Sequence, residues 1–168
     1  MYSYMTKNNI LYESQHGFRQ GHSTESLLIE FVDSVKHEVD QGHVPLGIFI
    51  DLSKAFDTLD HEILIKKLEF YGFNRYALKW FKSYFFNRKQ FTMVNKESSK
   101  LEIIKTGVPQ GSVLGPLLFL IYINDLKNCS NLLKFKMFAD DTTILLSICY
   151  NKKSVNIAII KGNIMYNK

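Results

Sequence analysis

The sequence contains little cysteine, proline or glycine and no long apolar segment. Among its 168 residues are 2 Cys, 3 Pro and 9 Gly. Cys129 and Cys149 have no neighbouring Cys or His at metal-ligand spacing, which argues against a disulfide scaffold or a zinc site and favours a reducing compartment. The longest apolar run, 113–123, is too short to cross a bilayer and is interrupted by Gly115 and Pro116. The N-terminal segment is polar and lacks the apolar centre of a signal peptide. We therefore expect an intracellular protein with no membrane partner.

The overall composition is that of a globular domain. Hydrophobic residues make up 46% of the chain and charged residues 22%, and we find no internal repeat or low-complexity linker. A length of 168 residues allows one domain with a core, or one domain plus a fragment. The net charge of +5 favours a polyanionic partner such as nucleic acid only weakly, because many ordinary domains carry as much.

Apolar periodicity and capping residues predict an α+β fold. Ser23 or Thr24 can cap a helix that ends near residue 40, and Asp60 and Asn74 can cap two more. Because strands and helices do not alternate regularly, we expect an antiparallel sheet covered by helices on one face. The first expected strand is 46–52, interpreted as buried. Strand 90–95 is expected to pair with 101–106, and 134–139 with 142–148 in a hairpin joined at Asp140-Asp141. A helix is expected over 116–126.

Three carboxylates stand directly after apolar runs. Asp51 ends the first expected strand, and Asp140 with Asp141 occupies the hairpin tip. Two adjacent acids at a tip are electrostatically costly unless a cation neutralises them, and Mg²⁺ takes oxygen ligands. The alternative is that Asp-Asp is a turn signal and that Asp51 terminates a strand; for the Asp-Asp pair taken alone this alternative is favoured.

The residues around these acids favour the cation-binding interpretation over that of a simple turn. Residues 49–57 (Phe-Ile-Asp-Leu-Ser-Lys-Ala-Phe-Asp) resemble the first catalytic motif of reverse transcriptases, and 106–119 (beginning Thr-Gly-Val-Pro-Gln-Gly-Ser) resemble the second. Residues 138–141 (Phe-Ala-Asp-Asp) resemble the third, and 15–24 (beginning Gln-His-Gly-Phe-Arg) are similar to the fingers motif that precedes them. The resemblance runs in family order over residues 8–147 and points to non-LTR retrotransposons of the jockey type.

The resemblance implies roles for individual residues. Asp51, Asp140 and Asp141 would be catalytic and would hold two Mg²⁺ ions, or Mn²⁺ in their place. The backbone at Leu52 would lie near the incoming triphosphate. Phe56 would exclude a 2′-hydroxyl and so select deoxynucleotides, although a Phe taken alone is more simply a core residue.

The resemblance also implies nucleotide contacts outside the acid cluster. Gln110 and Gly111 would form a loop that faces the nucleotide, and both also suit an ordinary turn. Arg19 would grip the triphosphate, a task suited to a guanidinium group, whereas a lone Arg in such a loop is usually just solvated. Farther along, Arg88 and Lys89 are candidate phosphate contacts, and the aromatic residues around them fit a buried helix face.

The resemblance divides the chain into three parts. Residues 1–45 would be a partial fingers region, 46–148 the palm of a right-hand polymerase with its catalytic motifs, and 149–168 a tail without assignment. Family members have several hundred residues around this core, so we expect a truncated copy without the thumb that grips the duplex. The implied partners are an RNA template, a DNA primer and deoxynucleoside triphosphates, in a nuclear or cytoplasmic ribonucleoprotein; the sequence carries no signal of oligomeric state.

Three functions stay open from the sequence alone. The first is an RNA-directed DNA polymerase core. The second is a catalytically silent or nucleic-acid-binding remnant of a retrotransposon enzyme. The third, an RNA-directed RNA polymerase, is disfavoured because those enzymes usually carry Gly-Asp-Asp and a polar residue where this chain has Phe56.

Overall fold

The computed structural model describes residues 1–149 and combines helices with antiparallel strands, as the sequence predicts. Within these residues no helix is long and apolar enough to cross a membrane. The elements in chain order are α1 (Tyr2–Lys7), α2 (Thr24–Asp40), β1 (His43–Ile50), α3 (His61–Phe70), α4 (Arg75–Phe85), β2 (Lys89–Gln90), β3 (Met93–Val94), β4 (Glu97–Ser98), β5 (Glu102–Ile103), α5 (Leu114–Ile123), the short 3₁₀ helix η1 (Leu126–Cys129), β6 (Leu133–Phe138) and β7 (Asp141–Cys149).

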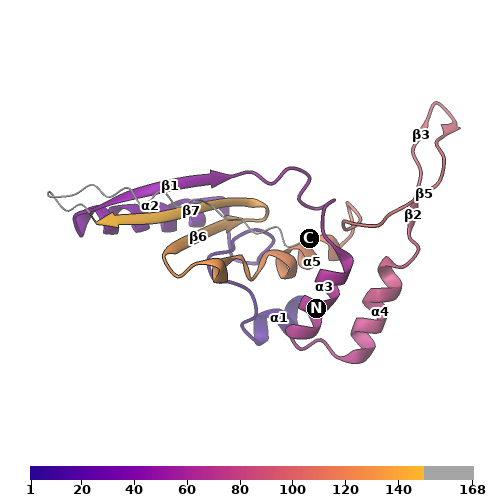
Figure 1. Ribbon diagram of the computed structural model, residues 1–168, viewed down its shortest axis with the longest axis horizontal. Helices are drawn as coiled ribbons and strands as arrows, with labels where there is room; N and C mark the ends of the chain where they lie inside the picture. Colours follow the sequence, from indigo (N-terminus) through magenta and orange to yellow (C-terminus); the bar gives the residue numbers. More distant parts are fainter. Residues whose placement is uncertain (150–168) are drawn as a thin grey trace.

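A three-stranded antiparallel sheet with the order β1-β7-β6 forms one end of the molecule (Figure 1). β7 is central, and its ladder with β1 runs to the pair Ile50↔Thr142. The β6–β7 hairpin expected from the sequence is present, but its last pair is Phe138↔Asp141. The two loop residues are therefore Ala139 and Asp140, one position earlier than the predicted tip.

Helix α2 lies against the sheet, where it contacts β1 and β6 (Figure 1). It begins as predicted, with Ser23 accepting a hydrogen bond from the Ser26 N–H and Ser26 returning one to the Ser23 N–H. The apolar residues that predicted the helix do not all face the sheet, since Leu28 is 61% exposed. Instead Glu38 pairs with Lys134 at 2.5 Å. Ion pairs to β6 thus add to a narrower apolar contact than the periodicity suggested.

Strand β1 is less buried than its apolar sequence predicts. Leu46 and Ile48 are 46% and 44% exposed, and β1 is an edge strand whose only neighbour in the part of the chain that the structure describes is β7. α2 covers the opposite face, where Phe31 and Phe49 have ring centroids 6.2 Å apart. An apolar run does not distinguish an edge strand from a central one.

The strand pair expected over residues 90–106 is split into two short ladders. β2 pairs with β5, and β3 pairs with β4 beyond them. Asn95 and Lys96 link β3 to β4 with φ of 50° and 70°, the backbone that a tight two-residue hairpin turn requires. All four strands are exposed, so the segment projects away from the body of the molecule (Figure 1).

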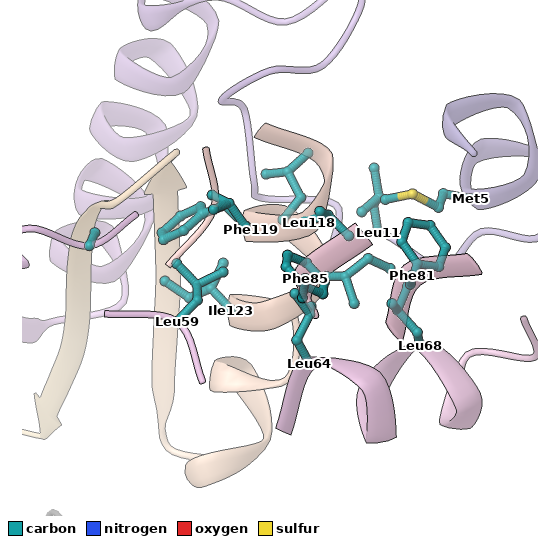
Figure 2. Close-up of a cluster of buried hydrophobic side chains, with 14 of the residues drawn as sticks. Met5, Leu11, Leu59, Leu64, Leu68, Phe81, Phe85, Leu118, Phe119 and Ile123 are labelled. Atoms are coloured by element: carbon teal, nitrogen blue, oxygen red, sulfur yellow. The ribbon is translucent and has the colours of Figure 1, made fainter. Parts of the chain in front are cut away.

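The hydrophobic core lies among the helices (Figure 2). Asp60 and Asn74 cap α3 and α4 as predicted, each side chain accepting from backbone N–H groups of the first turn. On α4 the buried residues are Phe81 and Phe85, whereas Trp80, which was expected on the same face, is 53% exposed. Helix α5 ends three residues before the predicted boundary. The residues of the core cluster that are fully or almost fully buried are Met5, Leu59, Leu64, Leu68, Leu118, Phe119, Leu120, Ile121 and Met137.

Helices contact both faces of the sheet rather than the single face that was expected. Lys136 points toward α2, where it pairs with Glu30. Its neighbour Met137 points the other way and is fully buried in the core cluster that includes α5. The β6 strand is therefore fixed from both sides, which matters because it leads into Asp140.

Candidate active site

The three predicted carboxylates lie at the same end of the sheet. Asp51 follows Ile50, which pairs with Thr142, and Asp141 immediately precedes Thr142. Asp140 is one of the two loop residues of the β6–β7 hairpin. Asp51 and Asp141 are exposed and Asp140 is half-buried. The fold therefore brings together residues that are about ninety positions apart in the chain.

The donor chemistry of this end suits a hard divalent cation. Within residues 1–149, no three His, Cys, Asp or Glu side chains converge closely enough to hold a metal ion by themselves. Mg²⁺ usually binds proteins through one or two carboxylates and completes its coordination with water and substrate phosphates. An exposed pair or trio of carboxylates without a closed cage fits that mode of binding. The predicted metal ligands thus lie at one end of the sheet, and the metal site itself stays a prediction.

The hairpin tip has an unusual backbone that a distant segment contacts. Ala139 has φ of +56°, a left-handed conformation that costs about 1–2 kcal/mol for a residue with a Cβ. The Gln15 side chain accepts a hydrogen bond from the Ala139 N–H at 2.9 Å and donates one to the Ala139 carbonyl at 3.1 Å. The same Gln15 oxygen accepts from the Gly17 N–H at 2.8 Å. Gln15 is 2% exposed, so these bonds are shielded from water.

Residues 14–17, which we call the strap, run along the outer edge of β6. The Met137 N–H donates to the Ser14 carbonyl at 2.9 Å, and the His16 N–H donates to the Met137 carbonyl at 2.7 Å. The sequence indicated no role for Gln15, although it belongs to the fingers motif at residues 15–24. A polar residue in a turn-rich segment gives no sign of burial, so its position within the motif was the one available signal.

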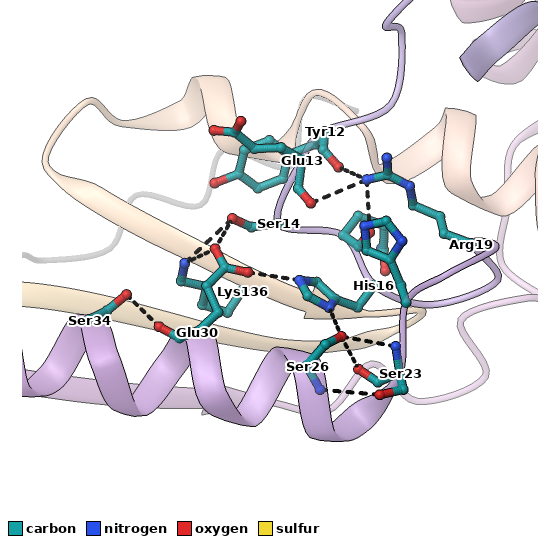
Figure 3. A network of polar contacts seen from close by, with 12 residues as sticks. Tyr12, Glu13, Ser14, His16, Arg19, Ser23, Ser26, Glu30, Ser34 and Lys136 are labelled. Atoms are coloured by element: carbon teal, nitrogen blue, oxygen red, sulfur yellow. Dashed lines mark hydrogen bonds and ion pairs between the residues drawn. The ribbon is translucent and has the colours of Figure 1, made fainter. Parts of the chain in front are cut away.

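A partly buried polar network connects the strap to α2 and β6 (Figure 3). Glu30 accepts hydrogen bonds from the Ser14 hydroxyl and His16 Nε2, each at 2.8 Å, and pairs with the Lys136 ammonium. His16 Nδ1 contacts the Ser26 hydroxyl at 2.8 Å. Partial burial acts to raise the pKa of Glu30, but the bonds from Lys136, Ser14 and His16 outweigh it and lower the pKa from 4.5 to about 2. Glu30 is therefore charged at neutral pH.

Arg19 has a structural role in this geometry. Its Nη1 donates to the carbonyl oxygens of Tyr12, Glu13 and Gln15 at 2.8, 3.2 and 3.2 Å (Figure 3). These bonds fold the segment before the strap around the guanidinium group. The predicted contact between Arg19 and a triphosphate stays a prediction.

Phe56 and Leu52 lie in the loop that follows Asp51. The Phe56 ring stacks on Phe119 with centroids 4.4 Å apart and meets Phe18 edge-on at 6.0 Å. Leu52 is 38% exposed, and a pocket of about 670 Å³ is lined by Asp51, Leu52 and residues of α5, among others. Phe56 is thus partly a core residue, as the simpler interpretation held, and it links this loop to the fingers motif through Phe18.

The loop of the second motif is hydrogen-bonded to the same segment. Gln110 donates to an Asp57 carboxylate oxygen at 3.2 Å, and the Val108 N–H donates to the Phe56 carbonyl at 2.9 Å. Gly107 has φ of +83°, and a Cβ there would lie 2.7 Å from the Asp57 backbone, so glycine is required. Gly111 is also left-handed, with φ of +76°, and has open space around it. Gln110 and Gly111 are both exposed.

A basic cleft of about 690 Å³ lies beside this loop. Arg88 and Lys89, the candidate phosphate contacts, line it together with Asp57 and Gln110. Lys54 and Lys105, which the sequence analysis did not single out, also belong to its lining. The cleft therefore carries more basic than acidic side chains.

The motifs and their arrangement define a class of nucleotide polymerases, and comparison with known proteins places the chain within it. Residues 1–160 match the family described as reverse transcriptase (RNA-dependent DNA polymerase). The chain belongs to this family.

Individual relatives come from mobile elements, which confirms the resemblance to the non-LTR retrotransposon type. The chain is 34% identical over 157 residues to the probable RNA-directed DNA polymerase from transposon BS of Drosophila melanogaster, covering 85% of this chain and 16% of that protein. It is 32% identical over 152 residues to the probable RNA-directed DNA polymerase from transposon X-element of the same fly, covering 84% and 16%. It is 30% identical over 139 residues to the RNA-directed DNA polymerase from mobile element jockey, covering 78% and 15%. The chain spans about a sixth of the length of these relatives.

Proposed function

We propose that this chain forms the core of an RNA-directed DNA polymerase that adds deoxynucleotides to a primer 3′-hydroxyl on an RNA template. The observation that carries the proposal is the placement of Asp51, Asp140 and Asp141 at one end of a single sheet, within motifs of the reverse transcriptase family. Residues 1–45 serve as part of the fingers and 46–148 as the palm. The proposed tail, 149–168, lies outside the described residues apart from Cys149.

The carboxylates have unequal roles in this proposal. Asp51 and Asp140 hold Mg²⁺ together with the phosphates of the incoming nucleotide, and Asp141 is more peripheral. When bound, two Mg²⁺ ions stabilise the attacking and leaving oxygens of an in-line phosphoryl displacement. The exposure of Asp51 supports this assignment, because a substrate phosphate has to reach the same ion.

Nucleotide selection falls to the two loops that the structure joins. The backbone at Leu52 approaches the triphosphate, and Phe56 lies against the sugar, where its ring excludes a 2′-hydroxyl. Gln110 and Gly111 face the nascent base pair, and Arg19 contributes charge near the triphosphate. The stacking of Phe56 on Phe119 supports a rigid position for that ring.

The basic cleft is proposed to receive the sugar-phosphate backbone of the template. Arg88, Lys89 and Lys105 line it beside the Gln110 loop. Binding through such groups releases counterions, so affinity should fall steeply as salt rises.

The experiment is Mg²⁺-dependent extension of a DNA primer on an RNA template by the 168-residue chain. Asp51→Asn and Asp140→Asn keep the side-chain shape and remove the charge, and both should reduce extension at least a hundredfold. Asp33→Asn, an exposed change on α2, is the matched control and should leave extension unchanged. Extension that persists in either site variant would refute the metal assignment.

A silent parent chain would support the second function, a nucleic-acid-binding remnant, which the basic cleft favours. Filter binding of the same RNA across a salt series would then test it. Salt-sensitive binding that survives Asp140→Asn and weakens in Arg88→Ala supports a binding module. Failure to bind at any salt concentration refutes that function as well.

A further inference from the structure

We propose that Gln15 is a positioning residue for the candidate active site, acting through the backbone of the turn that carries Asp140. The inference rests on the proposed function in one respect, that Asp140 is a metal ligand. The contact between Gln15 and the turn is observed independently of that assignment.

The turn requires external support. Ala139 occupies a left-handed conformation that glycine would adopt at no cost, and its N–H and carbonyl are both buried. The other strand of the hairpin supplies no partner to these two groups, because the ladder ends at Phe138↔Asp141. Gln15 bonds both of them with one amide group.

The amide of Gln15 is itself held in a fixed orientation. Its oxygen also accepts the Gly17 N–H, so a rotation of the amide by half a turn would break two bonds to N–H groups. The flanking residues Ser14 and His16 bond to Met137 in the β6 strand that leads into the turn. The strap thus fixes both the strand and the loop, and Asp140 follows directly.

Close contact leaves little room for the turn to move. A Cβ on Gly17 would lie 2.0 Å from the Ala139 nitrogen, so the two backbones touch. The strap is also held from the side of α2, where Ser14 and His16 both bond to Glu30 (Figure 3). The position of the Asp140 carboxylate is therefore set by residues from the N-terminal part of the chain, through Gln15.

The test compares Gln15→Met, which keeps the side-chain length and removes both polar atoms, with Gln20→Met as a matched control. Gln20 is exposed, and within residues 1–149 its side chain has no hydrogen-bond partner. Affinity for Mn²⁺ is measured by loss of the free-ion signal in electron paramagnetic resonance, with Asp140→Asn alongside. We expect Gln15→Met to weaken binding by at least about tenfold, as removal of groups that orient metal ligands does. Gln20→Met should bind as the parent does.

A rescue separates positioning from a general loss of stability. Ala139→Gly relieves the left-handed strain, so Gln15→Met/Ala139→Gly should recover at least about threefold of the lost affinity and should fold even where Gln15→Met does not. If the parent and Gln15→Met bind Mn²⁺ equally while Asp140→Asn does not bind, the positioning role is wrong.

Amide hydrogen exchange distinguishes failure of this inference from failure of the proposed function. The Ala139 N–H of the parent chain should exchange at least about tenfold more slowly than N–H groups of exposed loops, and Gln15→Met should remove this protection. If the parent binds no Mn²⁺, the metal assignment fails, and the role of Gln15 in fixing the turn is decided by this exchange. A rapidly exchanging Ala139 N–H in the parent overturns the inference whatever the variants do.

Discussion

The ion pair between Glu30 and Lys136 predicts that loss of the acid and loss of the base destabilise the fold unequally. The Lys136 side chain is 9% exposed and the Glu30 side chain 37%. Neutralising the acid in Glu30→Gln leaves the Lys136 ammonium nearly buried without its partner charge, because the Ser14 hydroxyl at 3.5 Å and the new amide oxygen are both uncharged acceptors. Removing the ammonium leaves a carboxylate that water can reach and that still accepts from Ser14 and His16. Glu30→Gln should therefore cost more stability than Lys136→Met.

Magnitudes follow from the burial of each partner. Leaving one fully buried charge unpaired costs about 3–5 kcal/mol; because water reaches the Glu30 side of this pair, we expect about 2 kcal/mol for Glu30→Gln. Lys136→Met should cost about 1 kcal/mol, since the remaining carboxylate is hydrated and the new side chain is apolar. The double variant should be more stable than Glu30→Gln alone, because no charge is left buried.

The pH dependence gives an independent check. The folded-state pKa of Glu30, about 2, lies below its ordinary value of 4.5, so its stabilisation is present above pH 4.5 and is lost as the pH falls toward 2. The full shift corresponds to about 3.4 kcal/mol, and hydration of the partly exposed carboxylate reduces this to about 1.5 kcal/mol. Between pH 5 and pH 2 the parent should lose about this amount more than Glu30→Gln does, because Glu38, whose pKa is also lowered to about 2, titrates in both chains.

Urea unfolding followed by far-ultraviolet circular dichroism at pH 7, 5, 3 and 2 measures all of these quantities. Equal losses for the two single variants, or a larger loss for Lys136→Met, would refute the argument from burial. A parent whose stability between pH 5 and 3 changes no more than that of Glu30→Gln would contradict the assigned pKa.

Two further predictions concern backbone positions. Gly17→Ala places a Cβ 2.0 Å from the Ala139 nitrogen and should lower the free energy of unfolding in urea by about 3 kcal/mol. The control Gly21→Ala has open space but φ of +77°, and should lower it by about 1 kcal/mol. Equal losses would show that the strap and the turn do not touch. Asp60→Ala removes the cap of α3 and should cost about 1 kcal/mol, with most of it restored in Asp60→Ser; an unchanged unfolding midpoint in Asp60→Ala would contradict the cap.

Local chemistry made much of this fold predictable. Ser23, Asp60 and Asn74 begin their helices as expected, because a side-chain oxygen that satisfies N–H groups acts within three residues. The hairpin was predictable because two apolar runs flank a short turn, although its loop residues lie one position earlier than expected. The candidate carboxylates came from motif resemblance. These features depend on short segments that the sequence displays directly.

The features that were missed depend on distant parts of the chain. The apolar run of β1 did not reveal that the strand lies at an edge, since neighbours in a sheet are chosen by the whole fold. The polar α2–sheet contact was hidden because Glu30 and Lys136 look like surface residues until they are paired. Gln15 was quoted within a motif, yet its partner lies 124 positions away.

That separation has a consequence for how the protein folds. Joining Gln15 to Ala139 closes a loop of most of the chain, and such contacts form late because the entropy of closure is lost before they stabilise anything. During synthesis the strap leaves the ribosome more than a hundred residues before the strand that it borders. The helices and their core can form from nearer contacts, so the end of the molecule that carries Asp140 should be the last to become ordered and the first to open under denaturant.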